Sequence, residues 1–155
     1  MILSIADPDA MAAMAARLAP YLVAGDLVAL NGELGAGKTT FTRGLGSALG
    51  VRGAVTSPTF VLARTHPRDG GAPLVHVDAY RLSSAVELDD LDIDFEHSIV
   101  VVEWGAGLLD GITDSWLQLD IERPHGGQPD DEGIEPRTVT ATGHGQRWTD
   151  LSWLG

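Results

Sequence analysis

The sequence predicts an α/β fold, a three-layer sandwich around a mixed, mostly parallel central sheet. Two continuous apolar runs, 27–30 and 99–102, are of the kind that parallel sheets bury on both faces. The first run leads through a glycine-rich loop into a helical pattern. A turn-rich segment, 66–71, is short enough to join two further strands as an antiparallel hairpin. Parallel strands and a hairpin together indicate a mixed sheet.

The composition is that of one folded domain, and we expect residues 1–155 to form a single unit. Hydrophobic residues make up 44% of the chain, which is too apolar for a disordered protein. The 22 acidic residues against 10 basic ones give a net charge of -12, which repels nucleic-acid backbones and anionic lipid. The chain has no cysteine, which excludes disulfides, thiolate zinc sites and thiol nucleophiles.

The amino terminus does not have the charge order of a secretion signal, because its first positive charge, Arg17, follows the apolar stretch. No segment approaches the ~18 uninterrupted apolar residues of a membrane helix. We therefore expect a cytoplasmic protein with no membrane partner.

The first half of the chain alternates strands and helices. Residues 1–5 are expected to form an edge strand, and Asp7 as N-cap with Pro8 as first helical residue begins a helix that ends near Leu18. The strand 27–30 follows, and the glycine loop leads into a second helix that ends at Gly50. The apolar positions of this second helix recur at helical spacing: Phe41, Leu45, Ala48 and Leu49.

The second half supplies the remaining strands of the sheet. Ser83 or Ser84 can cap a further helix, and the buried run 99–102 leads directly into Glu103. A loop rich in Gly, Pro and Asp, 122–136, is expected to be mobile. Besides 99–102, the predicted strands are 59–64, 73–77, 116–121 and 138–141.

Residues 32–39 fit the phosphate-binding pattern G-x-x-x-x-G-K-[ST]. Its glycines let consecutive backbone N–H groups point inward, and these donors and the positive end of the following helix hold phosphate oxygens. Lys38 would reach the β- and γ-phosphates, the Thr39 hydroxyl would bind Mg²⁺, and Thr40 is placed to contact the α-phosphate. Because the loop follows a buried strand and begins a helix, the predicted sandwich is P-loop NTPase-like.

Lys38 is the only lysine in the chain, whereas arginine occurs nine times. A compact ammonium fits a tight phosphate loop in which a broad guanidinium does not fit. The composition thus supports the same position independently of the motif.

A phosphate loop also needs a carboxylate at the end of a neighbouring buried strand. Glu103 follows the most apolar strand, and we assign it to the metal. Asp78 follows a less apolar strand and is the candidate for polarising water or for holding the hydration shell of Mg²⁺. Because successive side chains of a strand point to opposite faces, we expect His76 to lie away from Asp78 as a packed or solvated histidine, and a single imidazole is weak evidence for a metal ligand.

Four ordered motifs closely resemble the TsaE (YjeE) family: GELGAGKTT at 32–40, SPTF at 57–60, HVDAYRL at 76–82 and VEWG at 102–105. The resemblance covers nearly the whole chain. It implies a small bacterial P-loop ATPase that works with TsaB and TsaD in making the threonylcarbamoyl modification of adenosine next to the anticodon of tRNAs. ATP and Mg²⁺ are the implied cofactors, with turnover expected to be slow without the partners.

The resemblance also implies roles for individual residues. Thr39 and Glu103 are the implied Mg²⁺ ligands, Thr59 resembles a switch element over the γ-phosphate, and Asp78 is similar to an acid needed for turnover. Further nucleotide contacts are implied near Pro8 and Arg137; the loop 122–136 before Arg137 matches no family motif. The implied contacts to the phosphates are Gly35, Ala36, Gly37, Lys38, Thr39 and Thr40.

Three other functions compete with an ATPase. A GTPase would commonly use an Asn-Lys-x-Asp element, for which the chain has no second lysine. A small-molecule kinase would need an arginine-bearing lid, and no arginine-rich segment stands out. A nucleotide-gated binding module without turnover of its own stays open. The acidic composition predicts that the chain does not hold tRNA on its own, so the link to tRNA that the resemblance implies is indirect.

Overall fold

The computed structural model describes residues 1–33, 36–53, 55, 63–79, 91–103, 109, 113–123 and 136–154. Its strands are β1 (Ile2–Ile5), β2 (Leu27–Asn31), β3 (Ala63–His66), β4 (Leu74–Asp78), β5 (Ile99–Glu103), β6 (Trp116–Glu122) and β7 (Arg137–His144). The α-helices are α1 (Pro8–Leu18) and α2 (Lys38–Leu49). Short 3₁₀ helices are η1 (Ala19–Tyr21), η2 (Phe95–His97), η4 (Gln146–Trp148) and η5 (Ser152–Leu154).

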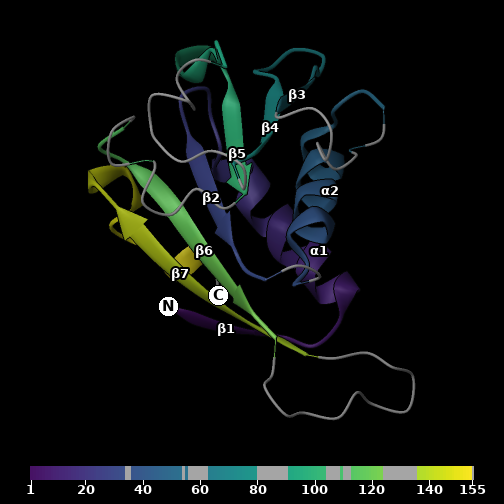
Figure 1. The fold of residues 1–155 in the computed structure, drawn as a ribbon, viewed down its shortest axis with the longest axis vertical. Helices are drawn as coiled ribbons and strands as arrows, with labels where there is room; N and C mark the ends of the chain where they lie inside the picture. The colour runs from purple at the N-terminus through teal and green to yellow at the C-terminus, as the bar shows by residue number, and fades with distance from the viewer. Residues whose placement is uncertain are drawn as a thin grey trace.

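The described strands form a seven-stranded sheet in the order β1-β7-β6-β2-β5-β4-β3 (Figure 1). The four inner strands, β6, β2, β5 and β4, are parallel. The outer strands β1, β7 and β3 pair antiparallel with their neighbours. This arrangement confirms the predicted mixed sheet with a parallel centre, and β3 and β4 form the predicted hairpin.

The first helix begins where the sequence predicts it. The Asp7 backbone is extended, and its Oδ1 accepts a hydrogen bond of 2.8 Å from the Ala10 N–H, so Asp7 is the N-cap and Pro8 the first helical residue. The apolar side chains Met11, Met14 and Leu18 are all buried. This face of α1 therefore packs entirely inward.

The second helix, α2, ends at Gly50, whose φ of 75° lies in the left-handed region that favours glycine. Phe41 and Leu45 are buried as expected, but Ala48 is exposed, and Gly46 lies on the buried face instead. A Cβ on Gly46 would come within 2.5 Å of a Val55 methyl group, so the helix packs closely on that side, and Ala48, about 200° further around the helix, faces outward.

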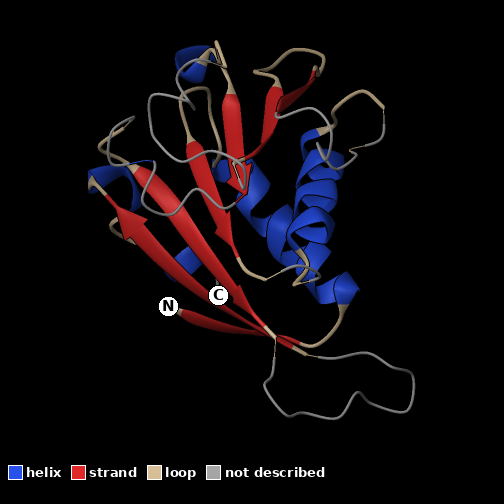
Figure 2. Ribbon diagram, viewed as in Figure 1, coloured by secondary structure: helices blue, strands red, loops and turns tan. Residues whose placement is uncertain are grey.

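Two hydrophobic clusters cover the two faces of the sheet, as side-chain alternation along β2 and β5 requires. On one face, Val28 and Val101 pack against α1 and α2, which lie together on that side (Figure 2). On the other face, Ala29 and Val102 pack in a cluster that also holds Leu109 and the partly buried side chains of Leu91, Ile93 and Phe95. The sheet is thus the middle layer of the fold.

Some predicted features lie outside the described residues: the helix capped by Ser83 or Ser84, residues 59–62 of the hairpin, and residues 124–135 of the loop before β7. The hairpin strand β3 runs to His66, two residues past its predicted end at Arg64. The tail strands β6 and β7 are longer than the predicted 116–121 and 138–141. No helix in the described part of the chain is long and apolar enough to cross a membrane.

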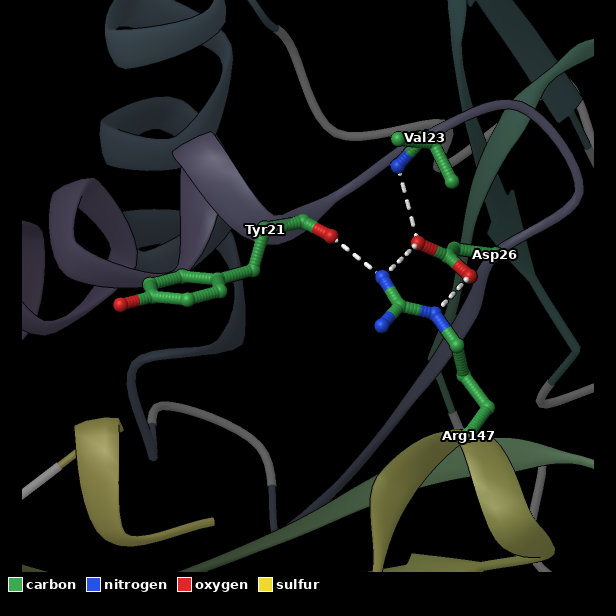
Figure 3. A network of polar contacts seen from close by, with 4 residues as sticks. All are labelled: Tyr21, Val23, Asp26 and Arg147. Carbon is green, nitrogen blue, oxygen red and sulfur yellow. Dashed lines mark hydrogen bonds and ion pairs between the residues drawn. The ribbon is translucent and has the colours of Figure 1, made fainter. Parts of the chain in front are cut away.

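An ion pair between a buried carboxylate and a partly exposed guanidinium joins the tail to the turn before β2 (Figure 3). Asp26 is only 7% exposed, and its carboxylate accepts two hydrogen bonds, of 3.1 and 3.0 Å, from the Arg147 guanidinium. Arg147 also donates to the Tyr21 carbonyl, and the Val23 N–H donates to Asp26. These groups lie up to 126 residues apart in sequence, so neighbouring residues do not reveal the contact.

Replacing Arg147 with alanine is expected to lower the free energy of unfolding by about 1.5–3 kcal/mol, because it leaves a buried carboxylate without its charged donor. The matched control is Arg52→Ala, which removes an ion pair to Asp69 whose side chains are 68% and 81% exposed. That control is expected to cost no more than about 0.5 kcal/mol. Urea unfolding measures both; equal midpoints for the two variants would show that the Asp26–Arg147 pair does not stabilise the fold.

Candidate functional site

The glycine loop connects β2 to α2 at the carboxyl edge of the parallel strands (Figure 1). Gly37 is the N-cap of α2 with a φ of 113°, a backbone conformation that residues other than glycine rarely adopt. A Cβ at Gly37 would lie 3.3 Å from the Met11 methyl group, so α1 supports the loop from behind. Ala36 is buried, whereas Leu34 and Gly35 lie outside the described residues.

Lys38 lies inside the curve of this loop. It is 7% exposed, and its Nζ donates to the carbonyl oxygens of Gly32 at 2.7 Å and of Glu33 at 3.1 Å. Burial lowers the pKa of the ammonium, while the carboxylates of Glu103, Asp78 and Glu33 act in the opposite direction. The lysine therefore stands among three acids, with its donors aimed at the loop backbone.

Thr39 and Thr40 occupy the first turn of α2 and are partly exposed. The first N–H groups of a helix have no partner within it and carry its partial positive charge. Thr42, one turn further on, donates its hydroxyl hydrogen to the Lys38 carbonyl at 3.0 Å, so this hydroxyl already has a partner within the helix. The hydroxyl groups of Thr39 and Thr40 are thus the ones that an anion at the amino-terminal end of α2 could contact.

The two predicted acids are neighbours at the edge of the sheet. Asp78 ends β4, Glu103 ends β5, and the two are register partners in the parallel pair. Glu103 also pairs with Leu30 on β2, two residues before the loop begins. Glu103 is 4% exposed, whereas Asp78 is half-buried. The sheet thus places both carboxylates beside the glycine loop.

The orientation of His76 differs from the one expected from the sequence. Residues two apart on a strand share a face, so His76 lies on the same face as Asp78 and not on the opposite one. The side chain is fully buried, as a packed histidine should be, but its Nε2 is 3.4 Å from the Glu103 Oε2. The imidazole therefore lies against the site.

Arg137, at the start of β7, contacts the loop directly. Its Nε donates to the Ala36 carbonyl at 3.0 Å across 101 residues of sequence. Strand β7 runs antiparallel to β6, which brings its first residue to the carboxyl edge of the inner strands. Pro8 is exposed at the start of α1, which approaches the loop at Met11. Thr59 lies outside the described residues.

A cleft of about 370 Å³ opens between the loop and the end of β6. Within it the Asn31 amide donates to the Asp120 Oδ1 at 3.1 Å, on register partners of β2 and β6. Sequence analysis did not single out either residue, although Asp120 near the end of a predicted strand is the same signal that identified Asp78. The lining residues are Asn31, Gly32, Glu33, Asp120, Ile121, Glu122 and Arg123.

The oxygen donors at the loop and at the end of β5 are of the kind that would suit Mg²⁺ bound together with a phosphate group. Within the described ranges, no group of three or more His, Asp or Glu side chains could hold a metal ion. Magnesium usually binds through one or two carboxylates together with substrate phosphates and water. Glu103 and the Thr39 hydroxyl supply oxygens of that kind, so the donor set suits a metal that arrives with phosphate.

Comparisons with known proteins agree over most of the chain. Residues 5–129 match the family described as Threonylcarbamoyl adenosine biosynthesis protein TsaE. A tRNA threonylcarbamoyladenosine biosynthesis protein TsaE from Streptomyces coelicolor is 59% identical over 144 residues, covering 89% of this chain and 95% of that protein. The protein of the same name from Bacillus subtilis is 37% identical over 148 residues, covering 94% and 87%.

A solved structure shows the same fold. The crystal structure of Bacillus subtilis YdiB superposes with a TM-score of 0.71 and 31% sequence identity, over 96% of this chain and 88% of that one. The family match includes the glycine loop, the hairpin of β3 and β4, and both acids. The chain therefore belongs to the TsaE family of threonylcarbamoyl adenosine biosynthesis proteins.

Proposed function

We propose that this chain binds and hydrolyses ATP with Mg²⁺ at residues 32–40, in support of tRNA threonylcarbamoyladenosine formation with TsaB- and TsaD-like partners. The observation that carries the proposal is the position of Lys38, buried in the loop, with the carboxylates of Glu103, Asp78 and Glu33 all acting on its ammonium. The family match supports the pathway, and the phosphate loop supports the nucleotide.

The phosphates would lie where the Lys38 ammonium and the first N–H groups of α2 converge. At present Lys38 donates to two neutral carbonyl oxygens, and a phosphate oxygen is the stronger acceptor for a charged donor. The remaining phosphate contacts would come from Gly35, Ala36, Gly37 and Thr40. The hydrogen bond from Arg137 to Ala36 would fix the loop, in addition to the nucleotide contact that the resemblance assigns to Arg137 and to Pro8.

The two acids would divide the remaining work. Glu103 and the Thr39 hydroxyl would hold Mg²⁺, which supplies charge neutralisation at the phosphates when bound. Asp78, the more exposed carboxylate, would orient the attacking water or hold the hydration shell. Thr59 would act as a switch over the γ-phosphate.

A nucleotide-gated binding module is the main alternative, because partners complete the catalytic site in several P-loop proteins. A small P-loop kinase is less well supported: Arg64 and Arg68 lie in the hairpin, where Arg68 donates to the Ala72 and Leu49 carbonyls. An arginine held in this way does not provide a mobile lid. The ATPase and the binding module differ in whether the chain hydrolyses ATP.

The isolated chain is expected not to hold tRNA at physiological salt, because the net charge is -12 and backbone affinity needs several clustered cations. Binding to TsaB and TsaD partners should instead follow the nucleotide state and be tighter with ATP than with ADP. Anisotropy titrations of labelled tRNA, run beside partner titrations in each nucleotide, measure both. Tight tRNA binding by the lone chain, or partner binding that ignores the nucleotide, would contradict the proposal.

A further inference from the structure

His76 is a fully buried polar side chain. It lies in the middle of β4, on the face that α1 and α2 cover, and its side chain is 0% exposed. Neither ring nitrogen has a hydrogen-bond partner within the part of the chain that the structure describes. A neutral imidazole always carries one N–H, and leaving a buried donor unpaired is destabilising. Packing alone therefore does not account for a histidine at this position.

The His76 ring lies close to a carboxylate oxygen of the site. His76 Nε2 is 3.4 Å from Glu103 Oε2, and both side chains are almost completely buried, at 0% and 5% exposure. The two residues sit on adjacent parallel strands, with His76 two residues before Asp78, the register partner of Glu103. A small rotation of either side chain would bring the pair to an ordinary hydrogen-bond length of about 2.7–2.9 Å.

We propose that His76 is a positioning residue for Glu103: the ring carries its proton on Nε2 and donates it to Oε2, which leaves the other carboxylate oxygen free for Mg²⁺. This inference rests on the proposed function, which makes Glu103 a metal ligand. Hydrogen bonds from neighbouring groups fix the orientation of metal-binding carboxylates, and losing one typically weakens metal binding about 10–100-fold. The buried pair would thus set the Mg²⁺ affinity without touching the nucleotide.

A matched pair of variants separates positioning from packing. His76→Gln and His76→Met introduce side chains of similar length and shape, but only glutamine has an N–H donor near the place of Nε2. A purely structural role would be served at least as well by methionine, which adapts to apolar gaps. A positioning role requires the donor, so glutamine should preserve it and methionine should lose it.

The readout is the Mg²⁺ dependence of nucleotide binding, followed with a fluorescent ATP analogue from EDTA to saturating Mg²⁺. We expect His76→Met to raise the Mg²⁺ concentration for half-maximal effect about 10-fold or more, with affinity in EDTA unchanged, and His76→Gln to stay within about three-fold of the unmodified chain. Equal Mg²⁺ dependence in the two variants overturns the inference. Thermal unfolding of both variants shows that each is folded.

A second measurement needs no variant protein to function. Long-range ¹H–¹⁵N correlations distinguish the two neutral histidine tautomers, and the His76 signals are those lost in His76→Gln. We expect the Nε2–H tautomer in the unmodified chain; an Nδ1–H tautomer would overturn the inference even if His76→Met does not fold.

The same titration distinguishes failure of the inference from failure of the proposed function. Glu103→Ala is included, and it should abolish the Mg²⁺ effect that the unmodified chain shows. If Mg²⁺ does not strengthen nucleotide binding in the unmodified chain, the proposed metal site is wrong and the role of His76 falls with it. If Glu103 matters and the two His76 variants behave alike, only the inference about His76 is wrong.

Discussion

Replacing Lys38 with alanine is expected to abolish ATP hydrolysis and to weaken nucleotide binding. No other lysine exists in the chain to supply a compact charge to the β- and γ-phosphates. Loss of one preorganised charged donor typically lowers turnover about 10²–10³-fold. Phosphate release and equilibrium binding of ATP measure the two effects separately.

Two further variants show whether charge or shape matters at this position. Lys38→Arg keeps the charge, but the guanidinium is broad and the loop is tight, with Lys38 already 7% exposed, so we expect it to fail as well. Arg43→Ala is the control, because this exposed residue of the same helix donates to the Val55 carbonyl and not to the loop carbonyls that Lys38 contacts. Normal turnover by Lys38→Ala would show that the phosphate site is elsewhere.

Glu103→Ala and Asp78→Ala are expected to fail in different ways, although the two residues are register partners. Glu103→Ala should lose Mg²⁺-dependent turnover together with the Mg²⁺-dependent part of nucleotide binding. Asp78→Ala should bind ATP almost normally and hydrolyse it about 10²–10⁴-fold more slowly, the range usual for loss of a group that transfers or orients a proton.

The division of roles is tested by titrating both variants with ATP in the presence and absence of Mg²⁺. The expected pattern is a binding defect in Glu103→Ala alone and a turnover defect in both. Arg52→Ala, which removes the exposed ion pair with Asp69, is the control and is expected to change neither measurement. Equal binding defects in the two acid variants would show that the assignment of metal to one acid and water to the other is wrong.

Local patterns were sufficient to predict the elements that surround the site. The cap at Asp7, the glycine at the end of α2 and the apolar runs of β2 and β5 all act within a few residues, so neighbouring positions reveal them. The loop and the acid that ends β5 were predictable for the same reason. The loop is recognised from the sequence because a strand, a turn and a helix follow one another in the correct order.

Contacts across the sheet could not be predicted from the same patterns. The approach of His76 to Glu103 depends on the pairing register of β4 with β5, and the hydrogen bond from Arg137 to Ala36 joins residues 101 positions apart. The first of these was also obscured by an error of periodicity, because residues two apart on a strand share a face. The ion pair of Asp26 and Arg147 likewise requires the folded tail.

The central claim is that this chain hydrolyses ATP at the loop 32–40 and that this hydrolysis supports tRNA modification with its partners. Phosphate release from ATP tests it most directly, measured with Mg²⁺ for the isolated chain and again with TsaB and TsaD present. We predict slow release by the chain alone, faster release with the partners, and none above background for Lys38→Ala in either condition. Release that is absent in the unmodified chain under both conditions, or that Lys38→Ala retains, would contradict the account.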